Sequence, residues 1–421
     1  MKTPLHATSG IPGNRENALK ERTPNDPMHV IQTVFGVFHH FDLATELQKR
    51  GHLEKVYSTW PWARLKREGL PKERVESFPW IHLPAYFYGR SKLHRAPVAQ
   101  QLQLLNAALF DRWTMRRLRA LQGNGTKVDA LIAISGSGTR TGRLLQQTGG
   151  VFICDRGSSH HRYQRNIVAE EDRIWGVERE PTSDLRVTAI EEEQYELADA
   201  ISVPSSFAVR SFVEMGVPRE KLRLIPYGVR LERFRPVADP PTDSFDVLFA
   251  GSVSLRKGVP YLLQAFAQLK HPNKRLRIAG AVDHVVKPVF DRLPNASVEW
   301  LGAVPQSDLI TLMSKSHVLV LPSIEEGLAL VQAQAMACGC PVIASHNTGS
   351  EDLYTDGVEG FIVPIRDAAS LADRMQRIAD DPGMHQRMRE AALNRVRHLG
   401  GWSEYGAKWE KTLLELLAAK R

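Results

Sequence analysis

Cysteine is scarce in this sequence: three residues, Cys154, Cys338 and Cys340, occur among 421, and the last two flank a single glycine. Their number and spacing fit neither a disulfide framework nor a paired zinc pattern. Apolar runs approaching the roughly eighteen residues of a membrane-spanning helix are also missing. These absences argue against a disulfide-rich secreted protein and against an integral membrane protein, and we expect a protein of the reducing cytoplasm.

The rest of the composition is that of a folded, water-soluble protein. Hydrophobic residues make up 43% of the chain and charged residues 24%, which is ordinary for globular domains. The length exceeds what one core usually supports and predicts two domains. The beginning differs, because it is polar, rich in glycine, proline and asparagine, and without the apolar core of a secretion signal. We predict that residues 1–27 form a disordered tail.

Strand-like apolar runs alternate with helical patterns in the first half of the chain. This alternation predicts βαβ units around a parallel sheet. We therefore expect an α/β, Rossmann-like domain over residues 28–236. Its expected strands are His29–Phe35, Ala130–Ile134, Val151–Cys154 and Ala200–Val203.

Turn residues between Pro236 and Ser244 interrupt the alternation and predict a linker. A second Rossmann-like domain is expected over residues 245–400, with a last helix at about 401–421 that packs back on the first domain. Ligands of such sheets bind at the carboxyl ends of the strands, so the site is expected in a cleft between the domains. The expected strands are Asp246–Ala250, Arg275–Ala279, Val298–Leu301, His317–Leu321 and Pro341–Ala344.

Positive charge is concentrated in one segment of this chain, whose net charge is +8. Between Lys49 and Arg119 there are fifteen Lys/Arg residues and five Asp/Glu residues, interleaved with aromatic side chains. Such a surface attracts anionic lipid headgroups and also nucleic acid. The alternative is a solvated basic face over an ordinary core.

A second cationic feature follows the first expected strand of the second domain. Gly251 ends this strand, and Arg256 and Lys257 precede the next helix. Two cations beside free backbone N–H groups at a helix start suit a phosphate or diphosphate. The pattern is weak by itself, because Arg-Lys in a loop is usually only solvated.

Two adjacent acids, Glu325 and Glu326, precede the most apolar helix of the chain, expected over Leu328–Ala337. Acids at a helix start stabilise it by a few tenths to about 1 kcal/mol, which explains one of them. Gly327 is not explained in this way, because glycine weakens a helix start unless another group approaches the backbone closely.

The expected helix contains two amides, Gln332 and Gln334, in otherwise apolar surroundings. Buried amides need hydrogen-bond partners. Ligand hydroxyls are one possible partner of Gln334, which lies about two helical turns after Glu326. Solvent or backbone groups are the alternative.

The longer pattern resembles the signature of family 4 glycosyltransferases, which have the GT-B fold of two Rossmann-like domains. It runs from Glu326-Gly through Gln334-Ala-Met-Ala to Pro341-Val-Ile-Ala344, where the family has Glu, seven residues, Glu, then Ala-Met-Ala-x-Gly-x-Pro-Val. The resemblance covers the second domain almost continuously and is weaker before about residue 190. Supporting segments at matching spacings are Leu197–Ser205, Gly216–Val229, Arg256–Gly258 and Gly357–Pro364.

The resemblance implies a retaining, metal-independent glycosyltransferase of the hexosyltransferase type, with a nucleotide diphosphate sugar as donor. Lys257 would hold the donor diphosphate, Glu326 would contact the donor sugar, and Gln334 would bind the ribose hydroxyls. A donor phosphate oxygen is thought to take the acceptor proton in this family, so no protein nucleophile is expected. The other expected donor-binding residues are Gly36, Ser252, Arg256, Gly280, Gly302, Gly327, Leu328, Ala329 and Leu330.

Three positions depart from the family pattern. Gln334 replaces a carboxylate, and charge-assisted hydrogen bonds are roughly twice as strong as neutral ones, so weaker ribose binding is expected. Ser252 occupies a position where many members have an arginine. Gly36 is single where many members have Gly-Gly.

Histidine pairs follow two of the expected strands in the first domain. Family members often place a histidine near the reacting sugar at about His160, which we prefer over His161 and expect to be catalytic together with Lys257 and Glu326. His39 and His40 could also line the cleft. A metal is not expected, because no third ligand of suitable spacing accompanies His160 and His161 and no Asp-x-Asp motif occurs. Surface or core histidines are the alternative for both pairs.

The predicted function is transfer of a sugar to the hydroxyl of a saccharide or lipid-linked saccharide in envelope or exopolysaccharide synthesis. The expected location is the cytoplasm, with possible peripheral binding of Lys49–Arg119 to the anionic inner face of the plasma membrane. Nucleic acid is not an expected partner. The alternatives are a GT-B epimerase or phosphorylase and a non-catalytic nucleotide-sugar-binding protein.

Overall fold

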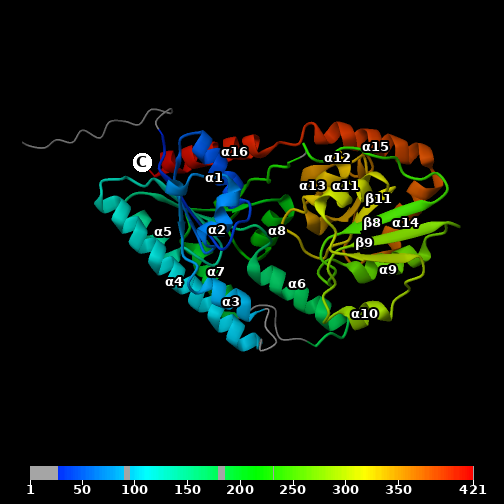
Figure 1. The fold of residues 1–421 in the computed structure, drawn as a ribbon, viewed down its shortest axis with the longest axis horizontal. Helices are drawn as coiled ribbons and strands as arrows, with labels where there is room; N and C mark the ends of the chain where they lie inside the picture. Colours follow the sequence, from blue (N-terminus) through cyan, green and yellow to red (C-terminus); the bar gives the residue numbers. More distant parts are fainter. Residues whose placement is uncertain (1–26, 90–94, 179–184, 231, 421) are drawn as a thin grey trace, which may run out of the picture.

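Two parallel sheets, each covered by helices, form the two halves of the molecule (Figure 1). The computed structural model describes residues 27–89, 95–178, 185–230 and 232–420. The predicted tail, apart from Pro27, lies outside these residues. The structure confirms the expected α/β class and the GT-B arrangement of two Rossmann-like units.

The first sheet contains the strands in the order β3-β2-β1-β4-β5-β6-β7. Every residue of β1 and β5 is buried, as expected for strands with helices on both faces. The four strands predicted in this half all form within one residue of their expected ends, whereas β2, β3 and β7 were not predicted. The strands are β1 (Val30–Val34), β2 (Leu53–Ser58), β3 (Val75–Ser77), β4 (Ala130–Ile134), β5 (Val151–Asp155), β6 (Ala200–Val203) and β7 (Leu222–Leu224).

Helices connect these strands and cover both sides of the sheet. They are α1 (His40–Lys49), α2 (Trp62–Leu65), α3 (His82–Tyr88), α4 (Ala96–Gly123), α5 (Thr139–Gln147), α6 (His161–Ile174), α7 (Leu185–Leu197) and α8 (Ser206–Glu214). Short 3-10 turns lie at Lys66–Glu68, Lys72–Arg74 and Arg219–Lys221. Ser205 begins α8 by accepting a hydrogen bond from the amide of Ala208, as an N-cap residue does.

The second sheet has the order β10-β9-β8-β11-β12-β13. Its five predicted strands form within one residue of their expected ends, and β13 was not predicted. The strands are β8 (Phe245–Ala250), β9 (Lys274–Ala279), β10 (Val298–Gly302), β11 (Val318–Leu321), β12 (Val342–Ser345) and β13 (Gly360–Val363). The helices are α9 (Val259–Gln268), α10 (Lys287–Asp291), α11 (Gln306–Ser314), α12 (Val331–Ala337), α13 (Ser350–Leu353), α14 (Ala368–Asp380) and α15 (Pro382–Val396), with a 3-10 turn at His346–Thr348.

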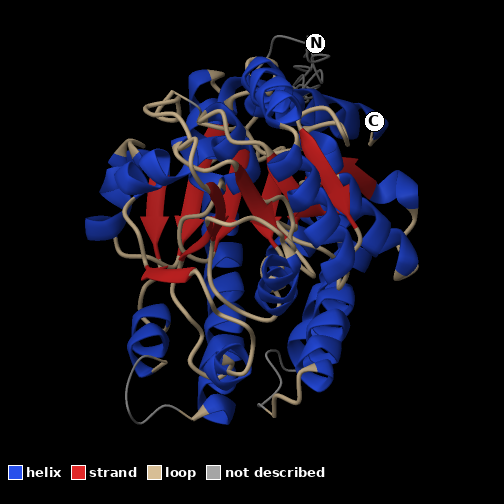
Figure 2. Ribbon diagram, turned by 90° about the vertical axis from the view of Figure 1, so that its right-hand side faces the viewer, coloured by secondary structure: helices blue, strands red, loops and turns tan. Residues whose placement is uncertain are grey.

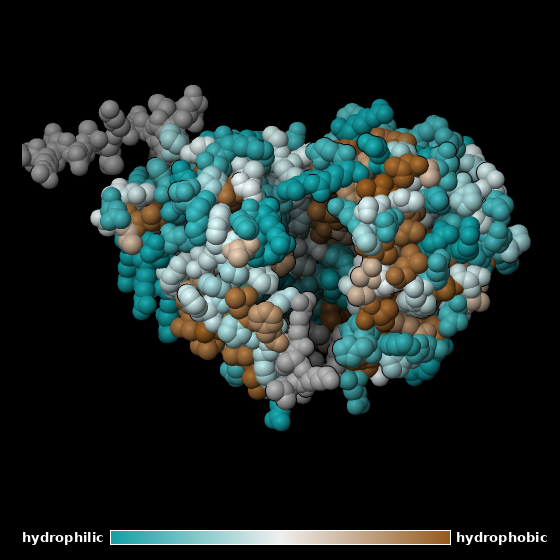
Figure 3. Space-filling model, in the orientation of Figure 1, coloured by the Kyte–Doolittle hydropathy of each residue, from teal (hydrophilic) through white to brown (hydrophobic). Residues whose placement is uncertain are grey.

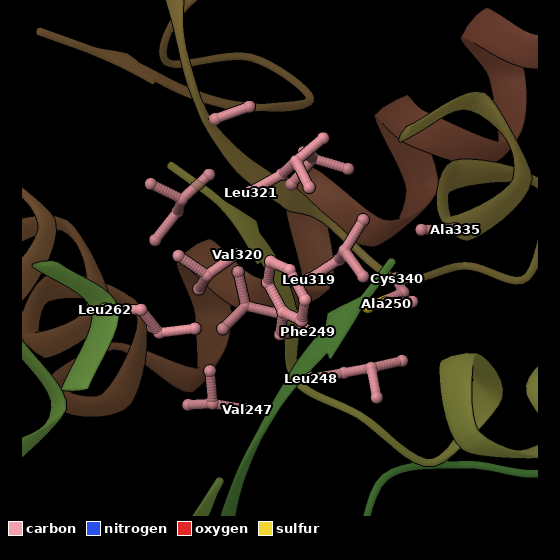
Figure 4. Close-up of a cluster of buried hydrophobic side chains, with 14 of the residues drawn as sticks. Val247, Leu248, Phe249, Ala250, Leu262, Leu319, Val320, Leu321, Ala335 and Cys340 are labelled. Atoms are coloured by element: carbon pink, nitrogen blue, oxygen red, sulfur yellow. The ribbon is translucent and has the colours of Figure 1, made fainter. Parts of the chain in front are cut away.

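The core of the second domain is built on its two central strands. Residues of β8 and β11 pack between Leu262 of α9 and Ala335 of α12 (Figure 4), and all residues of both strands are buried. Rigid central strands fix the loops that follow them, so the loops after β8 and β11 have defined positions at the carboxyl edge of the sheet.

The last helix, α16 (Trp402–Ala419), returns to the first domain. It packs on α1, where Tyr405, Trp409 and Leu413 join the core of the first sheet. The predicted linker between Pro236 and Ser244 contains no helix or strand. Helices lie on both sides of the strands (Figure 2), and a deep hollow separates the two domains (Figure 3).

One predicted helix begins later than expected. The helix expected over Leu328–Ala337 begins at Val331, so Glu325 and Glu326 lie in the preceding loop and no acid lies in the first turn. The helix-dipole explanation of these acids is therefore wrong. Residues of this loop, Glu325 and Gly327, contact the other domain.

Candidate active site

The loop after β8 brings two cations to the edge of the second sheet. Gly258 has a φ of 68° at the start of α9, and a Cβ atom at this position would lie 1.9 Å from the carbonyl oxygen of Pro322. A residue other than glycine would therefore separate the loops that follow β8 and β11. This close approach places Arg256 and Lys257 beside Glu325 and Glu326.

Lys257 and Glu326 form an ion pair between their Nζ and Oε1 atoms. The side chains of both residues are largely buried, with 13% and 14% exposed. Burial, together with the charge of Arg256, lowers the pKa of Lys257 to about 7. The expected phosphate-binding lysine and the expected sugar-binding acid thus lie in direct contact.

Glu325, which had no assigned role, connects the two domains. Its buried carboxylate accepts hydrogen bonds from Ser158 Oγ (2.6 Å), Ser159 Oγ (2.7 Å) and Gln164 Nε2 (2.8 Å) of the first domain. Arg256 Nη1 of the second domain lies 3.2 Å from Glu325 Oε2. Burial acts to raise the pKa of Glu325, but Arg256 and these hydrogen bonds outweigh it and hold the pKa below its usual value.

The glycine at position 327 is required by a contact between the two domains. A Cβ atom at Gly327 would lie 2.0 Å from the carbonyl oxygen of Gly157, so only glycine allows the loop after β5 to approach the loop after β11. Ser205 Oγ donates a 2.5 Å hydrogen bond to the carbonyl of Gly327. The close approach predicted for this glycine is thus made by the other domain.

The expected donor-binding residues 327–330 are partly engaged in contacts within the protein itself. The amide of Ala329 donates to the carbonyl of Thr348 at 3.1 Å, which removes it from the amides expected to contact the donor. Leu328 is buried in the core of the second domain, and Leu330 precedes α12 as its N-cap residue. Only the backbone of this loop, not its apolar side chains, could contact a polar ligand.

The two glutamines of α12 differ. Gln332 is fully buried, and its Nε2 donates to the carbonyls of Ala329 (3.2 Å) and Thr348 (3.1 Å). Gln334 is half-buried, and its amide side chain has no hydrogen bond to the described residues. The side chain of Gln332 therefore stabilises the loop before α12, whereas the side chain of Gln334 is available to a ligand.

The remaining expected donor-binding residues are spread along the strand ends. Ser252 is exposed directly after β8. Gly280, after β9, approaches the backbone of Gly251, whereas Gly302 ends β10 at the border of the sheet. Gly36, after β1, donates its amide to Thr59 Oγ1 at 3.1 Å in the first domain.

The ring of His160 packs inside the first domain. Its ring packs against Tyr195 and Phe212, with centroids 5.0 and 4.9 Å away, and burial with nearby Arg156 lowers its pKa to about 3. It lines a pocket of about 360 Å³ with other residues of the first domain. His161 lies 2.9 Å from Thr188 Oγ1. This placement gives no support to a catalytic role for His160.

The histidines after β1 lie at the domain contact instead. His39 Nε2 is 2.6 Å from Asp155 Oδ2, and His40 Nε2 is 3.2 Å from the same oxygen. Asp155, the last residue of β5, was missed; its position directly at a strand end was the available signal. Burial acts to raise the pKa of Asp155, but His39, His40 and Ser202 outweigh it and lower the pKa to about 2.

Among the described residues, these three side chains bring potential metal ligands within 4.8 Å of one another. The 2.6 Å separation of His39 Nε2 and Asp155 Oδ2 is that of a hydrogen bond. Two ligand atoms at about 2.0–2.2 Å from a tetrahedral zinc ion would be considerably farther apart. As arranged, the cluster fits a hydrogen-bonded histidine–aspartate pair and not a metal centre.

Two parallel α/β domains that meet along the carboxyl edges of their sheets, with paired charges at the contact, define a GT-B protein. Residues 232–395 match the family model of the glycosyl transferases group 1. The second domain is therefore similar to the glycosyl transferases group 1, in a chain with the GT-B fold.

Curated relatives match part of the chain. D-inositol 3-phosphate glycosyltransferase of Streptomyces bingchenggensis is 29% identical over 234 residues, which is 49% of this chain and 50% of that protein. The putative glycosyltransferase EpsD of Bacillus subtilis is 31% identical over 177 residues, or 38% of this chain and 46% of that protein. The chain thus spans about half the length of the curated relatives it matches.

Solved structures share the fold over nearly the whole chain. Sucrose-phosphate synthase from Thermosynechococcus elongatus has a TM-score of 0.68 and 22% identity, covering 93% of this chain and 100% of that structure. HepE of Anabaena in complex with UDP and glucose has a TM-score of 0.63 and 16% identity, covering 92% and 100%. At these identities the likeness concerns the fold.

In the part of the chain that the structure describes, no helix is both long enough and apolar enough to cross a membrane.

Proposed function

We propose that this protein is a retaining, metal-independent family 4 glycosyltransferase that transfers a hexose from a nucleotide diphosphate sugar to an acceptor hydroxyl. The observation that carries the proposal is the Lys257–Glu326 pair, with Arg256 beside it, at the edge of a group 1 glycosyltransferase domain. The pair lies where the loop after β5 of the other domain makes contact through Gly157 and Gly327.

The pair provides charge for both parts of a donor. Negative charge develops on the departing diphosphate as the bond to the sugar breaks, and preorganised cations stabilise such charge. Lys257 would exchange its contact with Glu326 for the diphosphate, which would free the carboxylate to accept hydrogen bonds from sugar hydroxyls. Arg256 adds a second charge but is also held by Glu325, so Lys257 carries the larger share.

The donor class is supported by the family match and by a structural neighbour. The HepE structure was solved with UDP-glucose as well as with UDP and glucose. We extend only the class, a nucleotide diphosphate sugar, to this protein. Gln334, half-buried on α12 without a side-chain partner among the described residues, would bind the ribose hydroxyls of the nucleotide.

A thermal-shift screen against nucleotide diphosphates and their sugars tests the proposal. Binding to the folded state raises the unfolding temperature in proportion to ligand concentration over Kd. The expected result is a shift with one nucleotide class, unchanged by EDTA, followed by transfer of the sugar in an acceptor screen with the anomeric configuration retained. Absence of any shift, or a strict requirement for a divalent metal, would contradict the proposal.

The acceptor is proposed to be a saccharide or lipid-linked saccharide of envelope or exopolysaccharide synthesis, met at the inner face of the plasma membrane from the cytoplasm. Trp80 is 73% exposed and Phe87 is 66% exposed, on the segment that also contains the excess of Lys and Arg. Other aromatic residues of the segment are structural, as Phe78 packs against Phe110 and Trp113. Exposed aromatic and basic side chains together favour an anionic membrane surface.

Vesicle sedimentation tests this second part of the proposal. Wild-type protein should bind vesicles that contain phosphatidylglycerol and should be released by salt, whereas a Trp80→Ala/Phe87→Ala variant should bind less. Phe38→Ala, which removes an exposed aromatic residue outside the segment (63% exposed), is the control. Equal binding to neutral vesicles would contradict the proposal.

A non-catalytic nucleotide-sugar-binding protein is the second candidate, favoured by Gln334 and Ser252 at positions where relatives of the resembled family carry charge. Calorimetry with the nucleotide sugar selected in the screen distinguishes the two. Tight binding without hydrolysis or transfer for any acceptor would favour the sensor.

A further inference from the structure

We infer that a pocket between α3, α4 and α7 of the first domain binds the apolar group of a lipid-linked acceptor, an alkyl or isoprenyl chain. This inference rests on the proposed function, because it concerns the acceptor of the same transfer. It narrows the proposed acceptor, a saccharide with or without a lipid, to one that carries a hydrophobic group.

The pocket lies where the strand order of the first sheet reverses. The order β3-β2-β1-β4-β5 changes direction between β1 and β4, and the residues that follow these two strands, Phe35 and Ser135, line the pocket. In open α/β sheets ligands bind in the crevice at such a reversal, outside the carboxyl ends of the strands. A ligand of the first domain is therefore expected at this pocket.

The walls of the pocket are largely apolar, and its volume is about 190 Å³. An apolar cavity of about 150 Å³ holds a benzene-sized molecule. The pocket therefore has room for one group of about this size and not for a whole lipid-linked saccharide. The apolar residues that line it are Phe35, Leu104, Ala107, Val187 and Ile190.

The acid and the hydroxyl in the lining already have partners. Glu191 Oε2 accepts a hydrogen bond from Tyr195 Oη at 2.5 Å, and Glu191 Oε1 accepts from Arg156 Nη1 at 3.2 Å. Ser135 Oγ accepts from the same nitrogen of Arg156 at 3.2 Å. A sugar ring in this space would bury several hydroxyls with few partners, which is costly, whereas an alkyl chain needs none.

One buried hydrogen-bond acceptor at the pocket has no partner. Asn106 lines the pocket and is 5% exposed, and its Oδ1 atom accepts no hydrogen bond from the described residues. A buried acceptor without a donor destabilises the free protein, and a ligand that donates one hydrogen bond removes this penalty. A single hydroxyl beside an apolar chain, as at the sugar end of a glycolipid, meets this requirement.

Aromatic side chains connect the pocket with the surface proposed to meet the membrane. His82 of α3 lines the pocket, and its ring contacts Trp60 at a centroid distance of 5.1 Å. Trp60 contacts Tyr86 at 5.2 Å, and Tyr86 contacts Phe87 at 5.6 Å. Phe87 is 66% exposed. A lipid chain that leaves a membrane at Phe87 would therefore follow aromatic side chains to the pocket.

Arg156 connects the pocket to the donor side of the molecule. Besides its bond to Glu191, it donates to Gln164 Oε1 at 2.8 Å, and Gln164 Nε2 donates to Glu325 Oε2 at 2.8 Å. Glu325 directly precedes Glu326, the acid proposed to contact the donor sugar. One arginine and one glutamine thus link the wall of the pocket to the loop that carries Glu326.

Calorimetry with octyl β-glucoside and methyl β-glucoside tests the inference before the natural acceptor is known. Both probes carry the same sugar, so a difference in affinity comes from the alkyl chain. Below its micelle concentration, the octyl probe should bind the wild type at least about tenfold more tightly than the methyl probe. Ala107→Leu, which fills the pocket, should remove most of this preference. Ile190→Ala, which removes part of the wall, should weaken it several-fold and serves if the leucine variant does not fold.

Ala108→Leu is the matched control. Ala108 is the next residue of α4 and is exposed, so the same substitution leaves the pocket open and should keep the preference for the octyl probe. Equal affinity of the wild type for both probes, or an unchanged preference in Ala107→Leu and Ile190→Ala, would overturn this inference alone, because neither result involves the donor. Absence of any thermal shift with nucleotide sugars would instead overturn the proposed function, and the pocket would then no longer be assigned to an acceptor.

Discussion

The two sheets follow the same plan, yet the loops at their carboxyl edges differ in chemistry. The edge of the second sheet carries Arg256 and Lys257 opposite Glu325 and Glu326. The edge of the first sheet carries His39 with Asp155 and, deeper in the domain, His160. Cations suit an anionic group such as a phosphate, whereas the first sheet presents a hydrogen-bonded histidine–aspartate pair. A repeated scaffold thus carries two edges of different chemistry.

The contact between the edges is made by glycine and by one buried acid. Gly157 and Gly327 allow the two backbones to touch, and Glu325 connects Ser158, Ser159 and Gln164 to Arg256. Farther along α6, Glu170 pairs with Arg366 at 2.8 Å, and Glu171 pairs with the same arginine. The first domain therefore contributes an element that holds the second in place.

Lys257→Ala should produce the largest effect, because it removes the main charge on the donor side. We expect kcat to fall about 10²–10³-fold, as for loss of one preorganised electrostatic group. Transfer is measured with the donor from the screen. The matched control is Lys315→Ala, an exposed lysine before β11 at the opposite end of that sheet. Unaltered turnover in Lys257→Ala would contradict the proposed role of Lys257 in sugar transfer.

The second domain was easier to predict from the sequence than the first. Its motif places Lys257 and Glu326 by spacing, and they do meet. The roles of Glu325 and Gly327 could not be predicted, because both depend on residues of the other domain about 160 positions earlier. His160 was expected near the sugar by resemblance alone, whereas packing against Tyr195 and Phe212 directs its ring into the first domain.

Glu325→Ala should loosen the contact between the two edges. Removing one partner of a buried ion pair costs roughly 3–5 kcal/mol, and here it also leaves three hydrogen-bond donors without their acceptor. We expect a lower midpoint of thermal unfolding and lower transfer, with a smaller loss for Glu325→Gln. Glu193→Ala, at an exposed position on α7, is the control. Equal midpoints for Glu325→Ala and Glu193→Ala would show that the contact is not part of the stable fold.

Donor binding should depend on pH through Lys257. Its pKa is lowered to about 7, so the free protein loses this charge as pH rises above 7, and a bound diphosphate favours the charged form. Affinity for the nucleoside diphosphate selected in the screen should therefore fall by up to about tenfold between pH 7 and 8, with proton uptake at pH 8. Calorimetry in two buffers of different ionisation enthalpy measures this uptake. In Lys257→Arg, which stays charged, both effects should disappear, and their persistence would assign them to another group.

The smallest predicted effect concerns Gln334 of α12, which stands where the glycosyltransferase motif has its second glutamate. Gln334→Glu adds a carboxylate to a half-buried position on α12. Charge-assisted hydrogen bonds are roughly twice as strong as neutral ones, so the nucleoside diphosphate selected in the screen should bind several-fold more tightly, whereas its 2′-deoxy form should gain less because it lacks one ribose hydroxyl. Gln268→Glu, an exposed glutamine at the end of α9, controls for added charge. Equal gains for both nucleotides would show that Gln334 does not face the ribose. Lys257 and Glu326 would then remain as the proposed donor-binding side chains of the second domain.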